Sequence, residues 1–429
     1  MLNWYGNHKI GVLGASNSGK TIFLTSLLWH LYNHDPERFV IGKGAKITDF
    51  QISKNPTHDF GFMQHKNTFV QKHCWPDKTF DYAIANCSYV RSDHKMIKRN
   101  ISFVDIPGER VSDILIWTSK SYTEWVERLH DFWLENPRIS EVVESFWDFA
   151  NDSKTEFKQL VIEFKKAMWS MLDMYCPITP STYYLGTDGH MLGDKDNSDR
   201  DVAIANRPVW EEGDLIPLPH GWLEAHPNDA RQLKKMFIDY KKKVLKPLFS
   251  EIRSCDNFIF CIDILNILMS GPELLFQTQR EFKDFIDTLA PSKFIKWRDF
   301  IGRNPSRLAF VATKSDLVAS DYKDNMSFLL KEIVEPLERS GINYRHYICS
   351  ACVSTQIKQS HTGQKQLIGK DRDKPESAIL LQCAIPECWP DTWDPYSYCF
   401  PEVAPVISSM HPPQQVNLDN IFEFIVEDK

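Results

Sequence analysis

Apolar segments of strand length alternate with segments of helical periodicity at both ends of the chain. Continuous apolar runs are typical of buried strands, and an alternating run is typical of a strand with one buried face. Such runs lie at 9–13, 80–90, 99–104, 257–263, 307–312 and 344–349. Helical spacing follows at 20–33, at 418–425 and at 325–340, where Phe328, Leu329, Ile333 and Leu337 form the predicted apolar face. This order predicts an α/β fold with a mixed, mostly parallel sheet.

The middle of the chain has a different pattern. Large apolar residues recur at helical spacing over 122–133, 157–172 and 233–244, and an acidic, loop-like stretch lies at 176–227. We expect an all-helical insertion domain at 111–254, inside an α/β domain formed by 1–110 and 255–429. Its tryptophans are interpreted as core residues: Trp125, Trp133, Trp147 and Trp169. The polar stretch 36–78 has little periodicity, and 356–415 is expected to form irregular loops or short hairpins.

Composition narrows the class of protein. The 429 residues are 42% hydrophobic, which supports a sizeable core, and carry a net charge of −7. That charge argues against general nucleic-acid binding, which favours a basic surface. The N-terminal residues lack the pattern of a signal peptide, and no apolar stretch approaches the length of a membrane span. The ten cysteines are scattered, as in a cytoplasmic protein with reduced thiols, and Cys349-x-x-Cys352 has no second pair at zinc spacing.

One segment predicts phosphate binding. Gly14 to Thr21 reads G-A-S-N-S-G-K-T, the pattern G-x-x-x-x-G-K-[ST], between a predicted strand and a predicted helix. Backbone N–H groups in such a loop, and at the helix N-terminus, bind phosphate oxygens. We expect Lys20 to reach the β- and γ-phosphates, and the Thr21 hydroxyl to be a Mg²⁺ ligand. The residues expected to bind the nucleotide here are Gly14, Ser16, Asn17, Ser18, Gly19, Lys20 and Thr21.

Three further segments, each at the end of a predicted strand, indicate which nucleotide binds. Asp105-Ile106-Pro107-Gly108 has the form D-x-x-G, in which the aspartate can hold Mg²⁺ and the Gly108 N–H can sense the γ-phosphate. Thr313-Lys314-Ser315-Asp316 has the form [NT]-K-x-D, whose carboxylate can accept two hydrogen bonds from guanine that adenine cannot donate. The aliphatic stem of Lys314 can lie along the base. Ser350, Ala351 and Cys352 are expected to reach the guanine carbonyl with their backbone N–H groups.

These motifs resemble those of the Ras-like GTPases and, more closely, those of the YcjX-like family of bacterial P-loop proteins linked to envelope or phage-shock stress. The closer resemblance rests on Ser16-x-Ser18-Gly19-Lys20-Thr21, Trp75-Pro76, Asp105-x-Pro107-Gly108-Glu109, Ser270-Gly271-Pro272, Ala312-Thr313-Lys314-x-Asp316 and 418–428. Trp75-Pro76 and Ser270-Gly271-Pro272 are not general GTPase motifs. The resemblance implies a Ras-like domain with a helical insertion after D-x-P-G, which hydrolyses GTP to GDP and phosphate with Mg²⁺.

The resemblance also implies catalytic roles. A Ras-like protein needs a threonine just before its second strand to ligate Mg²⁺, and Thr79 is the candidate, ahead of Thr57 and Thr68. Glu109 stands where Ras-like proteins carry the residue that orients the attacking water, and because a carboxylate repels the γ-phosphate we expect slow turnover. Arg110 stands where the family usually has tryptophan. An arginine finger could come from Arg110, from the insertion or from a partner, and the sequence leaves these sources open.

Two other classes of function stay open. A P-loop alone also permits an ATP-using ATPase or kinase, against which the 313–316 segment argues. A nucleotide-binding scaffold with negligible hydrolysis would carry the same motifs. Besides GTP and GDP we expect a protein partner of unknown identity. A membrane protein of a stress system, holding this cytoplasmic chain at the membrane, is compatible with the resemblance.

Overall fold

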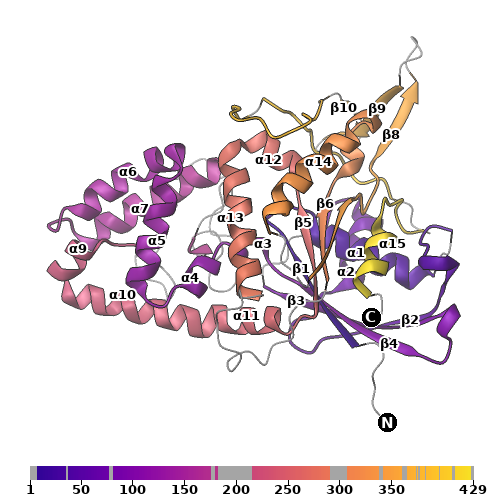
Figure 1. Cartoon of the computed structure of the whole chain (residues 1–429), viewed down its shortest axis with the longest axis horizontal. Helices are drawn as coiled ribbons and strands as arrows, with labels where there is room; N and C mark the ends of the chain where they lie inside the picture. The colour runs from indigo at the N-terminus through magenta and orange to yellow at the C-terminus, as the bar shows by residue number, and fades with distance from the viewer. Residues whose placement is uncertain are drawn as a thin grey trace. The chain divides into compact units, whose positions relative to one another are not determined.

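The computed structural model describes residues 7–34, 37–76, 81–174, 179–181, 215–289, 307–337, 342–359, 365–372, 374, 377–381, 383–395, 397–407 and 411–426. The chain divides into two compact units (Figure 1). The first unit comprises Met1–Gly108, Ile252–Pro272 and Ser292–Lys429. The second unit comprises Glu109–Glu251 and Glu273–Pro291.

The first unit is built on a seven-stranded sheet (Figure 1). In spatial order the strands are β2 (Ile47–Ser53), β3 (Ala83–Arg91), β4 (Lys98–Asp105), β1 (Asn7–Leu13), β5 (Asn257–Ile262), β6 (Arg307–Ala312) and β7 (Asn343–Ile348). Strands β4, β1, β5, β6 and β7 are mutually parallel, whereas β3 pairs antiparallel with β4 and with β2. The predicted α/β fold with a mixed, mostly parallel sheet is confirmed.

Edge strand β2 is not predicted by the sequence pattern. Its Ile47 and Phe50 are buried, but Thr48 and Gln51 between and beside them are exposed. The strand is held by antiparallel pairing with β3, in which Phe50 lies opposite Tyr89. An edge strand with so few buried positions has no continuous apolar run, so pairing rather than sequence pattern identifies it.

Helices cover both faces of this sheet (Figure 1). Helices α1 (Lys20–Asn33) and α15 (Leu418–Val426) share one hydrophobic cluster with strand residues that include Val12, Ile259 and Val311. Because side chains alternate along a strand, Phe260 and Phe310 point to the other face. Helix α14 (Lys323–Val334), with α12 (Ile264–Ser270) beside it, lies there against β6 and β7. The short helix α2 (Phe62–Asn67) packs against α1.

The apolar face predicted for the helix at 325–340 is partly wrong. Leu329 and Ile333 are fully buried and Leu337, in the short 3₁₀ helix that follows α14, is buried, but the Phe328 side chain is 55% exposed. The buried stripe of α14 consists of Met326, Leu329, Leu330, Ile333 and Val334. At about 100° per residue, Phe328 lies on the side of Leu329 away from Leu330 and so falls outside this stripe.

A second, smaller sheet belongs to the first unit. Its strands β8 (Thr355–Gln359), β9 (Lys365–Lys370) and β10 (Ala378–Leu381) are antiparallel in the order β10-β9-β8. The expected irregular loops or short hairpins at 356–415 are therefore hairpins in part. Farther along, the indole N–H groups of Trp389 and Trp393 donate to the carbonyls of Leu329 and Leu268, each at 2.9 Å, which attaches this segment to α14 and α12.

The described residues of the second unit are mainly helical. Its helices are α3 (Gly108–Val111), α4 (Ile114–Thr118), α5 (Tyr122–Leu134), α6 (Pro137–Asn151), α7 (Phe157–Asp173), α9 (His220–Ala225), α10 (Pro227–Tyr240), α11 (Lys246–Arg253) and α13 (Pro272–Leu289). Helix α9 lies within the stretch 176–227 that was predicted to be a loop, and residues 182–214 of that stretch lie outside the described residues. A π-helix at Lys241–Leu245 joins α10 to α11.

The tryptophans of the second unit belong mostly to its core, as predicted. Trp125, Trp133 and Trp147 are buried, and Trp169 is half-buried. The rings of Trp133 and Trp147 meet edge to face at 5.9 Å, and Phe164 packs against Trp133. Tilted and edge-to-face contacts of this kind are the preferred packing of aromatic rings.

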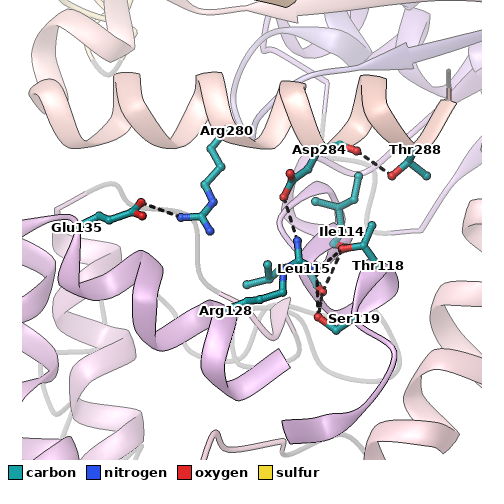
Figure 2. A network of polar contacts seen from close by, with 9 residues as sticks. All are labelled: Ile114, Leu115, Thr118, Ser119, Arg128, Glu135, Arg280, Asp284 and Thr288. Atoms are coloured by element: carbon teal, nitrogen blue, oxygen red, sulfur yellow. Dashed lines mark hydrogen bonds and ion pairs between the residues drawn. The ribbon is translucent and has the colours of Figure 1, made fainter. Parts of the chain in front are cut away.

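Two ion pairs connect α13 with α5 (Figure 2). Arg128 Nη2 lies 3.6 Å from Asp284 Oδ2, and Arg280 Nη1 lies 3.2 Å from Glu135 Oε2. Burial raises the pKa of Asp284, and the neighbouring Arg128 opposes that shift. All four side chains are partly exposed, so these pairs contribute about 1 kcal/mol or less each and mainly orient the helices. No helix among the residues described has both the length and the apolar character needed to cross a membrane.

Stacked aromatic rings on three neighbouring strands of the large sheet allow a prediction about stability. The Phe310 ring, fully buried, lies 5.0 Å from Phe260 and 6.1 Å from Tyr344, so it links three neighbouring strands. We expect Phe310→Ala to lower the free energy of unfolding by about 3 to 5 kcal/mol, because it removes this contact and leaves a cavity. Urea denaturation measures the change.

The exposed Phe328 provides the matched control for this substitution. Phe328→Ala should change the free energy of unfolding by no more than about 0.5 kcal/mol. Equal losses in the two variants would contradict the assigned packing of α14 and β6.

Candidate nucleotide-binding site

The glycine-containing loop from Gly14 to Gly19 connects β1 directly to α1. Gly14, Asn17 and Gly19 have φ angles of 150°, 62° and 85°, values that ordinary side chains disfavour. A Cβ atom on Gly14 would lie 2.1 Å from the carbonyl oxygen of Cys261 in β5, so only glycine fits there. The loop turns tightly at its centre, where the Ser18 N–H donates to Ala15 O at 3.3 Å.

Lys20 and Thr21 begin α1 and place two polar groups at this loop. The Lys20 side chain is buried, and its Nζ donates to the carbonyls of Gly14 and Ala15 at 2.9 and 2.8 Å. The ammonium therefore lies against the loop. The Thr21 hydroxyl donates to Asp105 Oδ2 at 3.2 Å, and Asp105 ends the neighbouring parallel strand β4 with no exposed surface. Two of the predicted Mg²⁺ ligands thus lie side by side.

Gly108 approaches the same loop from β4. A Cβ atom added to Gly108 would lie 2.4 Å from Ala15 C and from Ser16 N. Any larger residue would force the two segments apart, which explains why this position of the D-x-x-G segment is glycine. The structure thereby brings Asp105 and Gly108 together with the residues at 14–21, as predicted.

Asp316 links the two segments predicted to bind the base. It follows β6 in the 3₁₀ helix at Ser315–Leu317, and its Oδ1 accepts a hydrogen bond from Ser350 Oγ at 2.7 Å. Its Oδ2 accepts from the Ser354 backbone N–H at 2.8 Å. Burial raises the pKa of Asp316, while the bonds from Ser354 and Ser350 oppose that shift. Ser354 is a partner that the motif did not indicate.

Further polar contacts connect these two segments with the loop. The Thr313 hydroxyl donates to Ser18 O at 2.9 Å, across 295 positions of sequence. The Ser26 hydroxyl of α1 donates to Ala351 O, across 325 positions. Cys352, next in sequence, is buried, and burial raises its pKa to about 12, so its thiol stays protonated and packs as a small apolar group. All four predicted motifs therefore meet at one edge of the sheet.

Lys314 is oriented by a residue outside the four motifs. Its backbone has φ 61°, and its Nζ lies 2.5 Å from Oδ2 of Asp263, the residue that follows β5. An aspartate directly after a buried strand, at the sheet edge where the motifs were expected, is the sequence signal that could have identified Asp263.

Three residues predicted to be catalytic are not shown at this site. Thr79 lies outside the described residues, and so does the side chain of Glu109, whose backbone belongs to α3. Arg110 is buried in the second unit, where its Nη1 donates to Ser181 Oγ at 2.9 Å and to Tyr240 OH at 3.0 Å. The catalytic roles of these three residues stay predictions.

The partners of Arg110 are themselves anchored on a carboxylate. Asp113 has no exposed surface and accepts hydrogen bonds from Tyr240 OH at 2.6 Å, Ser181 Oγ at 2.5 Å and Ser181 N at 2.8 Å. Burial raises the pKa of Asp113, and Arg110 is the largest influence in the opposite direction. Because removal of one partner would leave a buried charge without compensation, this network holds Arg110 firmly.

Comparison with known proteins agrees with the motifs. A family model for the YcjX-like family matches residues 8–429. The Ras-like GTPase YcjX of Escherichia coli (strain K12) is 22% identical over 466 aligned positions, which cover 98% of this chain and 95% of that protein. Since the family model spans nearly the whole sequence, the chain belongs to the YcjX-like family.

Proposed function

We propose that this protein binds guanine nucleotides and hydrolyses GTP to GDP and phosphate with Mg²⁺, as a slow nucleotide-dependent switch. The observation that carries the proposal is the meeting of four motifs from distant parts of the sequence at one edge of the sheet. Ligands of open α/β sheets bind at the carboxyl ends of the strands. The similarity to the E. coli relative, which is named a Ras-like GTPase, supports the same conclusion.

The phosphate groups are assigned to the loop and to α1. Backbone N–H groups of Ser16 to Gly19 would bind the phosphate oxygens, and Lys20, already held against the loop, would neutralise their charge. The Thr21 hydroxyl beside the Asp105 carboxylate is an oxygen pair suited to Mg²⁺, and Thr79 is proposed as a third ligand. Mg²⁺ bound there would stabilise charge on the phosphate oxygens.

The base is assigned to the segments after β6 and β7. A carboxylate offers about four acceptor sites, so Asp316 can keep its bonds to Ser350 and Ser354 and still accept from guanine. Thr313 holds the Asp316 segment against the loop. Backbone N–H groups of Ala351 and Cys352 would reach the guanine carbonyl. The Ser350 N–H, predicted to do the same, instead donates to Val416 O at 3.2 Å. Adenine would offer no donor to the remaining acceptor sites of this buried carboxylate, which argues against the ATPase or kinase alternative.

Hydrolysis is proposed to depend on positioning and charge more than on covalent chemistry. Glu109, directly after Gly108, would orient the attacking water, and the γ-phosphate would leave as inorganic phosphate. Arg110 would have to exchange Ser181 and Tyr240 for phosphate oxygens before it could act as an arginine finger. That engagement favours slow intrinsic turnover, and it gives weight to the second candidate function, a nucleotide-binding scaffold with negligible hydrolysis.

The proposal assigns different roles to two domains of the chain. Residues 1–110 and 255–429 would form the Ras-like domain, and 111–254 an all-helical insertion that acts as a lid or as the surface a partner reads. Helix α13 departs from this division, because residues 273–291 belong to the second unit. A cytoplasmic role in envelope or phage-shock stress, exerted through a membrane-protein partner, follows only from the family resemblance.

The proposed base contact is tested by Asp316→Asn. We expect this change to weaken GDP binding by about a hundredfold, since hydrogen bonds to a charged group are lost. Xanthine has a carbonyl where guanine has its amino group, so the asparagine amide should favour xanthosine diphosphate over GDP. Competition for a fluorescent nucleotide measures both effects.

The exposed Asp321, five residues farther along, supplies the control. Asp321→Asn should bind GDP as the parent protein does. An Asp316→Asn variant that keeps the nucleotide preference of the parent would show that Asp316 does not contact the base.

Hydrolysis is tested in single turnover with GTP and excess protein. Glu109→Ala should lower the rate by about a hundredfold, the usual contribution of a group that assists proton transfer or orients water, while GDP affinity stays unchanged. Glu127→Ala, on the exposed side of α5, should hydrolyse GTP at the parental rate. A parental rate in Glu109→Ala would remove Glu109 from the mechanism.

A further inference from the structure

Asp263 lies at the carboxyl end of β5, between the P-loop strand β1 and the strand that leads to Lys314. Its side chain is only 6% exposed, and both of its oxygens have partners. Oδ1 accepts from the Asn266 backbone N–H at 3.0 Å and so caps α12, and Oδ2 pairs with Lys314 Nζ at 2.5 Å. The carboxylate is therefore fixed to a helix on one side and to a flexible cation on the other.

The backbone around this pair is fixed by the sheet. Strands β5 and β6 are parallel, with Ile262 opposite Ala312, and the Thr313 N–H donates to Ile262 O at 3.0 Å. Asp263 and Lys314 thus begin their loops side by side. Lys314 has the left-handed φ of 61°, a conformation that a residue with a side chain adopts only when its surroundings hold it.

Two carboxylates, those of Asp263 and Asp316, lie near the proposed base site, and they have different partners. Asp316 is bound by Ser350 and Ser354, whereas the lysine ammonium pairs with Asp263. A lysine salt bridge to Asp316 would compete with a base for the same oxygens. With Lys314 held by Asp263, the oxygens of Asp316 can accept from guanine.

We propose that Asp263 is a positioning residue for guanine nucleotides: it holds the Lys314 ammonium so that the four-carbon stem is preorganised as the surface on which the purine ring lies. This inference rests on the proposed function. A lysine stem is flexible and loses conformational freedom when it is ordered, so a partner that orders it before binding lowers the cost of binding. Asp263 acts through Lys314 and supports affinity, while selection between guanine and adenine belongs to Asp316.

The test is a double-mutant cycle read as the dissociation rate of fluorescent GDP. Asp263→Asn should release GDP about tenfold faster than the parent, with an unchanged ratio of GDP to ADP affinity. Lys314→Met, which keeps an apolar stem without the charge, should also release GDP faster. In the Lys314→Met background, Asp263→Asn should have no further effect, because the ammonium through which it acts is gone.

Two controls separate this role from a structural one. Asp263→Ser keeps a side chain that caps helices well, so it tests the loss of the ion pair alone, and it should match Asp263→Asn. Asp256 lies at the opposite end of β5, where its carboxylate accepts from the Lys9 N–H at 3.0 Å. Asp256→Asn should release GDP at the parental rate.

The outcomes are distinguishable. A parent protein that binds no guanine nucleotide would defeat the proposed function itself. A parent that binds GDP while both Asp263 variants release it at the parental rate would overturn the inference alone. A full tenfold effect of Asp263→Asn in the Lys314→Met background would also overturn it, because Asp263 would then act independently of Lys314.

Discussion

The parallel pairing of β1 with β4 on one side and β5 on the other is the constraint on which the candidate site depends. Val12 lies opposite Asp105 and Leu13 opposite Phe260, so the loop after β1 emerges between the ends of two other strands. This register brings Asp105 within hydrogen-bond reach of Thr21 and places Cys261 O against Gly14. A shift by one residue would exchange the two faces of β1 and separate these groups.

Hydrogen bonds between residues far apart in the sequence then connect the segments at the carboxyl ends of these strands. Thr313 binds Ser18 and Ser26 binds Ala351, so the loop and α1 are joined to the segments after β6 and β7. Thr313 satisfies the buried carbonyl of Ser18, and Ser26 satisfies the partly buried carbonyl of Ala351. A buried carbonyl left unpaired would cost about 1 to 3 kcal/mol. The segments proposed to bind the base and the phosphates therefore form one connected structure.

Sequence reasoning predicted the elements whose signal is local. Buried strands such as β5 and β6 have continuous apolar runs. The loop at 14–19 has a motif in which a close backbone contact explains Gly14 and a positive φ angle explains Gly19. Strand β2 was not predicted because pairing with β3, a long-range interaction, stabilises a largely polar segment. Asp263 was missed because its partner is 51 positions away. The engagement of Arg110 with Tyr240, 130 positions away, could not be read from spacing.

The central claim, that this sheet edge binds guanine nucleotides, is tested most directly on the unmodified chain. A fluorescent GDP would be bound in the presence of Mg²⁺ and then competed separately with GDP, GTP, ADP and ATP. The account predicts displacement by GDP and GTP at stoichiometric to low excess concentrations, and by ADP and ATP only at concentrations about a thousandfold higher or more. Equal displacement by adenine nucleotides would contradict it and would leave only a phosphate-binding loop.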